Sequence, residues 1–214
     1  MAETGARPWA RSDEKHQAIV RAAREVFLSN GYLGTNMDLI ASRSGVSKQT
    51  IYTHFGSKEA LFIAIVGSMT GDAGDRVHHE RPDLGDDEDL EEYLRAFAQR
   101  QLLIVMVPEL LQLRRLVIGE VGRFPELAAV LYERGPQRAI AEITTMFERL
   151  CDRGRLVVDD PAVAAEWFNW LVMAAPLNRA MMLGDAAIPA EDDLRRHAAE
   201  AVRIFLTAFG PPSP

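Results

Sequence analysis

The sequence contains little that could carry covalent or metal chemistry. Its 214 residues include a single cysteine, Cys151. The chain can therefore form neither an internal disulfide nor a cysteine-based metal cluster, which favours a reducing, cytoplasmic environment. The five histidines form no His-Glu-x-x-His pair, and no Gly-x-Ser-x-Gly motif is present. We expect a protein that is not an enzyme and that uses no metal and no cofactor.

The sequence also lacks long apolar runs and alternating patterns. The richest apolar stretch, residues 167–183, is interrupted by Asn169, Pro176, Asn178 and Arg179, so it falls short of the roughly 20 apolar residues that cross a membrane. No segment alternates between apolar and polar residues, as a half-buried strand would. The sequence therefore predicts an all-α protein with no membrane partner.

The chain lacks an excess of positive charge except near its N-terminus. The formal net charge is -7, yet residues 1–60 carry eight Lys and Arg against six Asp and Glu. The rest of the chain is strongly acidic. The N-terminal part can therefore approach a polyanion such as DNA, and the acidic part would face away from it.

Helical periodicity, divided by capping signals, is what the sequence does have. Ser12 and Asn30-Gly31 are expected to bound a first helix. Thr35 opens a second in a Thr-x-x-Asp capping pattern, and Gly45 suits the sharp turn that follows. We therefore predict about nine helices in three parts: a disordered basic arm at 1–11, a three-helix helix-turn-helix domain at 12–56, and a larger helical ligand-binding and dimerisation domain at 57–210.

The third helix, between Ser47 and Gly56, has a polar face that a plain core helix would not need. At about 100° per residue, Ile51 and Phe55 mark its buried side. Gln49 and Thr53 point away from the core, where they could meet base edges. Lys48 stands at the positive end of the helix dipole, which makes more sense beside a phosphate or a guanine.

Other polar groups on or beside this helix suit the DNA backbone. Tyr52 and His54 lie on its flanks, and Lys58 follows Ser57 at the start of the next helix, where free backbone N–H groups attract anions. The alternative is that Tyr52 is partly buried and that Lys48 is only solvated. The whole set on one short helix favours the DNA-binding interpretation.

These residues closely resemble the N-terminal domain of TetR-type (tetracycline-repressor-like) bacterial transcriptional regulators. The resemblance covers about residues 13–62, with turn, caps, core and flanks in the same order and spacing. Gly119–Leu127 and Tyr132–Pro136 look like the AcrR/AefR-type subgroup, many of whose members control efflux or stress genes. The residues that carry the main match are Phe27, Gly31, Tyr32, Thr35, Ile40, Ala41 and Gly45–Leu61.

The resemblance implies an all-α homodimer whose last two helices form the dimer interface. It also implies roles for single residues, to which we add Ser47 and Thr50 at the start of the third helix. The expected base-reading residues are Lys48, Gln49 and Thr53, and the expected phosphate-contacting residues are Thr35, Ser47, Thr50, Tyr52, His54 and Lys58.

Apolar segments in the larger domain suggest where the chain dimerises. Residues 163–183 are apolar nearly all round, so the helix must be enclosed on more than one side. Two such helices from each subunit would form a large isologous interface. The alternative is that both helices are intrachain core. The expected interface residues are Val163, Leu171, Ala174, Leu194, Ala201, Val202, Phe205 and Phe209.

The same domain is expected to hold an apolar effector pocket with Asn169 or Gln112 as polar groups. For each lining candidate, ordinary core packing is the alternative, especially for methionine. The candidates are Met69, Phe97, Met106, Leu110, Leu113, Phe147, Trp167, Asn169, Trp170 and Met173.

These features predict a ligand-responsive, sequence-specific DNA-binding regulator. We expect a repressor that leaves a near-palindromic double-stranded operator when a small apolar or amphipathic effector binds. The alternatives are a DNA-binding regulator without an effector and an activator.

Overall fold

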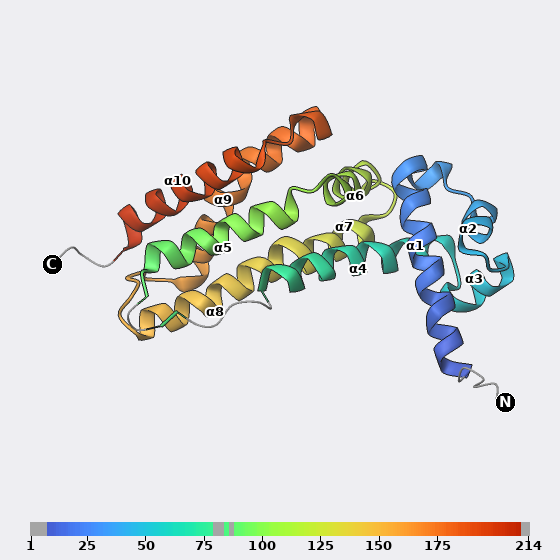
Figure 1. The fold of residues 1–214 in the computed structure, drawn as a ribbon, viewed down its shortest axis with the longest axis horizontal. Helices are drawn as coiled ribbons and strands as arrows, with labels where there is room; N and C mark the ends of the chain where they lie inside the picture. Colours follow the sequence, from blue (N-terminus) through green and yellow to red (C-terminus); the bar gives the residue numbers. More distant parts are fainter. Residues whose placement is uncertain (1–7, 79–83, 86–87, 211–214) are drawn as a thin grey trace, which may run out of the picture. The chain divides into compact units, whose positions relative to one another are not determined.

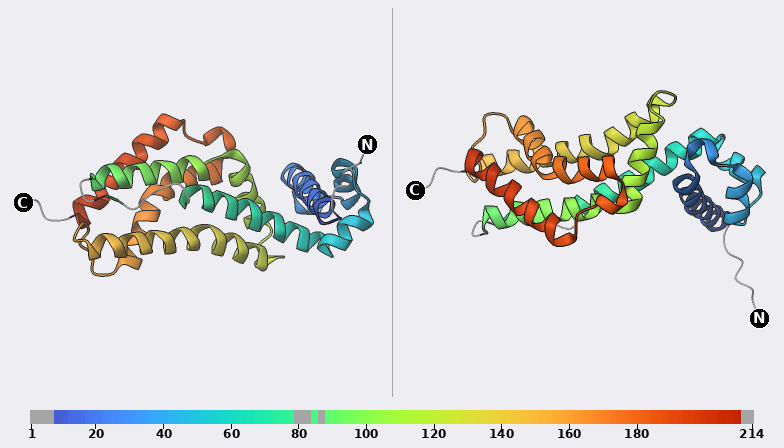
Figure 2. Two further views of the ribbon diagram at one scale, coloured as in Figure 1. Left: turned by 60° about the horizontal axis from the view of Figure 1, so that its bottom comes forward. Right: turned by 90° about the horizontal axis from the view of Figure 1, so that it is seen from above.

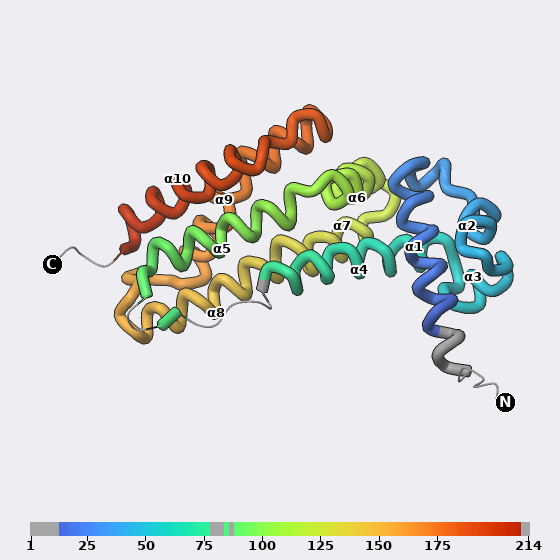
Figure 3. Tube along the Cα trace, viewed as in Figure 1, coloured from blue at the N-terminus to red at the C-terminus, as the bar shows by residue number. Residues whose placement is uncertain are grey.

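The computed structural model describes residues 8–78, 84–85 and 88–210. Over these residues the regular elements are helical and no strand is present, which confirms the all-α prediction (Figure 1). Helix α7 (Pro125–Tyr132) runs into α8 (Arg138–Asp152) through a π-helical turn, Glu133–Gln137, and Figure 3 shows this stretch as one coil. With α7 and α8 taken as one, the described chain has the nine helices that were predicted.

The chain divides into two compact units. The predicted boundary after residue 56 differs from the observed one, because α4 (Lys58–His78) buries Leu61 and Phe62 beside the helix-turn-helix. The first turns of α4 therefore fold with the DNA-binding part. The N-terminal unit consists of residues 1–68 and 116–130, and the C-terminal unit of residues 69–115 and 131–214.

The N-terminal unit is built on α1 (Pro8–Gly34), with α2 (Met37–Ser44) against α1 and α3 (Lys48–Phe55) against α2 (Figure 1). Its core contains a group of rings. The ring centroids of Phe27 and Phe62 lie 4.7 Å apart, and those of Tyr32 and Phe62 lie 5.3 Å apart. These rings fix α1 to α4 and so hold the frame that carries α3.

Two helix starts in this unit differ from the prediction. Helix α1 begins at Pro8 rather than after Ser12, so residues 8–11 are helical and not part of a disordered arm; residues 1–7 lie outside the described residues. Proline suits a first helical turn because its φ is already fixed and it has no N–H to satisfy. Helix α2 is capped by Asn36 rather than Thr35: the Asp38 N–H donates to Asn36 Oδ1 at 2.8 Å.

The C-terminal unit packs α10 (Glu191–Phe209) on α5 (Leu90–Val105) and on α9 (Pro161–Leu183), and it packs α8 on α9 (Figure 2). Its core centres on Phe205, whose ring lies 5.2 Å from that of Phe147 and 5.1 Å from that of Phe168. Among the described residues, no helix is long and apolar enough to cross a membrane. The remaining helix, α6, spans Pro108–Gly119.

Half of the predicted interface residues belong to this core instead. They are buried within the single chain, so the prediction that they meet a second subunit is wrong. The physical reason is that α10 turns its apolar stripe inward and keeps charged side chains outside, including Arg196 and Arg203. The misassigned residues are Leu194, Ala201, Val202 and Phe205.

Candidate DNA-binding helix and effector pocket

Local capping presents α3 as a short, well-defined helix. Gly45 has a φ of 70° in the turn between α2 and α3, a left-handed conformation that favours glycine. Ser47 then caps α3, with the Thr50 N–H donating to Ser47 Oγ at 3.1 Å. The hydroxyls of Ser47 and Thr50 lie 2.8 Å apart and share a hydrogen bond. Ser47 and Thr50, two of the predicted phosphate contacts, are therefore part of the cap at the N-terminus of α3.

The predicted face of α3 is exposed. Ile51 is fully buried, whereas Gln49 and Thr53 are exposed and Tyr52 is 37% exposed. The Thr53 hydroxyl donates to the Gln49 carbonyl at 2.9 Å, so it is bonded within its own helix. Gln49 and Tyr52 are thus the more available of these groups for bases and phosphates.

Lys48 has a partner that the sequence analysis missed. Its ammonium donates to Asp38 Oδ2 at 3.0 Å, from the first turn of α2. This hydrogen bond and the charge of Asp38 raise the pKa of Lys48 above its usual value. The pairing explains why a cation is tolerated at the start of α3 without DNA, and it places a carboxylate beside a predicted base-reading group.

We expect Asp38→Asn to tighten DNA binding about 3- to 10-fold, because one negative charge near the phosphates disappears. The slope of log affinity against log salt should steepen by about one counterion. Fluorescence anisotropy over a salt series measures both. Asp192→Asn, which removes the same charge from α10, is the control and should change neither. Weaker binding by Asp38→Asn would mean that Asp38 positions Lys48 for contact.

The structure corrects the role predicted for Thr35. It is 5% exposed, and its hydroxyl donates to the Gly31 carbonyl at 2.7 Å. That hydroxyl closes the last turn of α1 and is not free to contact a phosphate as predicted. The carbonyl of Thr35 instead accepts a hydrogen bond from Lys58.

Lys58 is tied into the fold. Its ammonium donates to the Thr35 carbonyl at 2.7 Å and lies 4.7 Å from the centroid of the Tyr32 ring. Desolvation by these neighbours lowers the pKa of Lys58 below its usual value. Lys58 therefore links α4 to the end of α1, and only its remaining N–H groups are left for a phosphate.

His54 lies in an aromatic cluster at the end of α3. The ring of His16 stacks on that of Phe55 at 4.9 Å, and the His54 ring lies edge-on to His16 at 6.1 Å. His16, which the sequence analysis did not select, thereby secures α3 against α1. His54 remains half-buried beside this contact.

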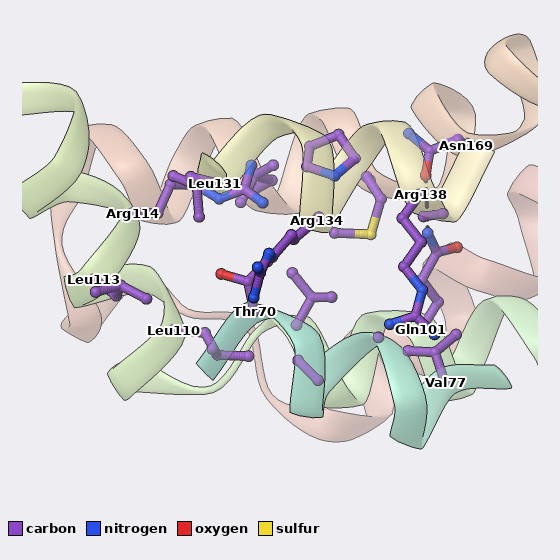
Figure 4. A pocket seen from close by; sticks show the side chains of 18 of the residues that line it. Thr70, Val77, Gln101, Leu110, Leu113, Arg114, Leu131, Arg134, Arg138 and Asn169 are labelled. Carbon is purple, nitrogen blue, oxygen red and sulfur yellow. Dashed lines mark hydrogen bonds between the residues drawn. The ribbon is translucent and has the colours of Figure 1, made fainter. Parts of the chain in front are cut away.

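A cavity in the C-terminal unit lies among α4, α5, α6, α8 and α9 and the π-helical turn (Figure 4). Its volume is about 80 Å³, several times the 10–15 Å³ that one water needs. Two glycines let its walls approach: a Cβ at Gly135 would lie 3.2 Å from Thr70 Cγ2, and one at Gly74 would lie 3.3 Å from Arg138 Nη1. The cavity is therefore built into the fold and is large enough for more than solvent.

Half of the predicted pocket residues line this cavity: Leu110, Leu113, Asn169, Trp170 and Met173. The other half do not, because they fill the core or lie at the surface. Gln112 is also elsewhere, donating to Asp185 Oδ2 at 2.6 Å. The residues wrongly assigned to the pocket are Met69, Phe97, Met106 and Phe147, which are buried among other side chains, and Trp167, which is 52% exposed and stacks on Phe209.

The pocket is more polar than predicted. Three arginines line it, Arg114, Arg134 and Arg138. Thr70 and Gln101, both buried, join them. A signal for Arg114 was visible in the sequence, since it follows Leu110 by four residues and so continues the apolar stripe of α6. Among the described residues, no group of His, Cys, Asp and Glu could hold a metal ion.

One face of α9 is apolar and exposed in the single chain. Met182 is 76% exposed, and no acidic or basic side chain interrupts the centre of the face, from Trp170 to Ala175. Soluble chains seldom leave such a stripe uncovered. Its residues are Val163, Trp167, Trp170, Leu171, Ala174, Ala175 and Met182, which include three of the eight predicted interface residues.

A short exposed helix, presented by a glycine turn and seated on a second helix, defines a helix-turn-helix DNA-binding protein. Residues 19–65 match the model of bacterial regulatory proteins of the tetR family. Residues 92–211 match the C-terminal domain of AefR-like transcriptional repressors. The chain therefore belongs to the TetR family of DNA-binding transcriptional regulators, which are not enzymes. Regulators of this family bind operator DNA and form dimers.

Known proteins resemble the chain either over nearly its whole length or over a short part of it. A TetR-family protein from Mesorhizobium loti MAFF303099 is 36% identical, with a TM-score of 0.87 over 94% of this chain and 98% of that one. The flavonoid-responsive regulator FrrA is 32% identical, with a TM-score of 0.75 over 93% and 98%. The transcriptional activator FasR of Mycolicibacterium smegmatis is 46% identical over 54 residues, only 25% of either chain. The match to curated relatives such as FasR thus spans about a quarter of their length.

Proposed function

We propose that this chain is a homodimeric, ligand-responsive regulator that reads a near-palindromic operator with α3, most simply as a repressor. The observation that carries the proposal is the exposed polar face of α3 around Gln49, held by the buried Ile51. Two copies would place α3 in successive major grooves, with half-site centres about 10 bp apart or slightly more.

The apolar face of α9 supports the homodimer. A second copy of the same face would cover Leu171 and Ala174 across a two-fold axis. The exposed side of α10 is less suited to this, because it carries ion pairs such as Arg203–Glu200 at 2.6 Å. The proposed interface is therefore formed mainly by α9, against which α10 packs within the same chain.

The cavity supports effector control. Helix α4 contributes Thr70, Ala73, Gly74 and Val77 to the cavity, and Leu61 and Phe62 of the same helix are buried in the N-terminal unit. A ligand that favours one position of α4 can therefore change the affinity of the N-terminal unit for DNA. A tenfold loss of operator affinity requires only about 1.4 kcal/mol of coupling.

We also propose the direction of control, which is repression. The match to AefR-like repressors over residues 92–211 favours repression. FasR, by contrast, is named as a transcriptional activator and is 46% identical to this chain over 54 residues. Activation is therefore the second candidate. A reporter gene downstream of the preferred DNA site, with and without this protein, distinguishes the two by the sign of the change.

Two substitutions on α3 test the DNA-binding face. Gln49→Ala should change base preference at one position in each half-site, costing about 1–3 kcal/mol on the preferred duplex. Tyr52→Phe should weaken binding to all duplexes alike, because it removes only a hydroxyl that faces the backbone. Anisotropy on a panel of single-base variants measures both. Unchanged affinity and preference for Gln49→Ala would show that another face reads DNA.

A further inference from the structure

Arg114 of α6 is a cation in the cavity wall without a counter-charge. Among the described residues, no hydrogen bond or ion pair reaches its guanidinium, and burial lowers its pKa below the usual value. Its neighbour Arg115 differs: it forms an ion pair with Asp185 and donates to the Ala180 carbonyl at 3.1 Å. A largely enclosed and unpaired charge is costly, so Arg114 would gain from an anion beside it.

The other charges of the cavity have the same sign. Arg138 is neutralised by Asp75 and Glu142, each at 2.7 Å. Arg134 lies at the more exposed part of the wall. No aspartate or glutamate is among the described residues that line the cavity. The cavity therefore favours a negatively charged ligand.

Two uncharged groups at the cavity also lack partners. Gln101 donates through Nε2 to Asn169 Oδ1 at 2.8 Å, but Gln101 Oε1 and Thr70 Oγ1 are buried and accept or donate no hydrogen bond among the described residues. Figure 4 shows Arg114 and the Gln101–Asn169 pair on opposite sides of the space, with Thr70 between them. Gln101 Oε1 requires a donor, which a ligand hydroxyl could supply.

The wall between these ends is apolar. It excludes water from the body of a ligand and leaves polar recognition to the ends. Trp170 adds an aromatic surface suited to a flat ring. The apolar and aromatic lining residues include Ala73, Val77, Val105, Leu110, Leu113 and Trp170.

We propose that the cavity binds an organic acid with an apolar or aromatic body and a hydroxyl at the far end, its carboxylate on Arg114 and its hydroxyl on Gln101. This inference rests on the proposed effector function and specifies its ligand class. The carboxylate forms paired hydrogen bonds with the guanidinium of Arg114 and supplies the missing charge. The hydroxyl of Thr70, which lies between Arg114 and Gln101, provides a further hydrogen bond to the ligand.

Matched ligand pairs test the charge requirement. The probes are hydroxylated aryl and alkyl carboxylic acids of 6–12 carbons, roughly the size that fills such a pocket, each with its methyl ester and its analogue without the hydroxyl. Titration calorimetry and thermal shift on the full-length dimer measure binding. The acids should bind about 10- to 100-fold more tightly than their esters. Loss of the hydroxyl should cost about 3- to 10-fold.

Two arginine variants test the residue. In Arg114→Met the preference for acids should fall below about twofold, while the unliganded Tm stays the same or rises, because an unpaired enclosed charge is removed. Arg115→Met, the same change one residue along, should keep the preference for acids but lower the Tm, because Asp185 loses its partner. If Arg114 were merely structural, Arg114→Met would instead lower the Tm of the unliganded protein.

Three results would overturn the proposal. They are esters that bind as tightly as acids, a preference for acids that survives Arg114→Met, and a series in which no acid binds while the protein still binds its preferred duplex. Failure to bind any preferred duplex would instead count against the proposed DNA-binding function, which separates the two.

Discussion

Ala174→Glu is expected to dissociate the dimer and to lower affinity for the preferred duplex at least about 100-fold. Ala174 lies exposed in the centre of the apolar face of α9, where two copies would bring two glutamates together in a desolvated contact. The monomer should keep its fold, since glutamate is a good helix former and no packing is lost. The loss on DNA follows because two linked half-site contacts gain about 10²–10⁴ over one.

Ala141→Glu is the matched control. Ala141 is exposed on α8, so the same residue change adds the same charge away from the proposed interface. Light scattering and anisotropy should show a dimer with wild-type affinity. If Ala174→Glu also remained dimeric at micromolar concentration, the proposal that α9 forms the interface would be contradicted.

Phe205→Ala is expected to lower the free energy of unfolding by about 3–5 kcal/mol. Phe205 is fully buried between Phe147 and Phe168, and the structure around it cannot collapse into the space left by the ring. Total stabilities are only about 5–15 kcal/mol, so much of the chain would be unfolded at modest urea concentration. Urea denaturation followed by circular dichroism measures the change.

Val157→Ala is the control for Phe205→Ala. Val157 is exposed at the surface of the same unit, and its truncation should change stability by less than about 0.5 kcal/mol. A Phe205→Ala protein that unfolds like the wild type but has become monomeric would return Phe205 to the interface, where its sequence pattern had placed it.

Features fixed by neighbouring residues could be predicted from the sequence. The positive φ at Gly31 and Gly45, and the Ser47 cap of α3, follow from local backbone chemistry. The Asp160 cap with Pro161 at the start of α9 is of the same kind. The sequence was less decisive between adjacent capping candidates, as at Thr35 and Asn36.

Features set by tertiary packing could not be predicted in this way. An apolar stripe does not say whether it faces the chain's own core or a second subunit, so Phe205 and Ala174 were placed in one interface. The same limit put Phe147 in the pocket. The Lys48–Asp38 pair joins residues ten positions apart on two helices, and no periodicity within one helix reveals it.

We propose above all that two copies of α3 read a near-palindromic operator. Selection of random DNA duplexes by the purified full-length protein, followed by sequencing, tests it most directly. We predict enrichment of an inverted repeat with half-site centres about 10 bp apart or slightly more, and a changed base preference when Gln49→Ala is used. No enrichment over the starting library, or enrichment of a single half-site without a repeat, would contradict it.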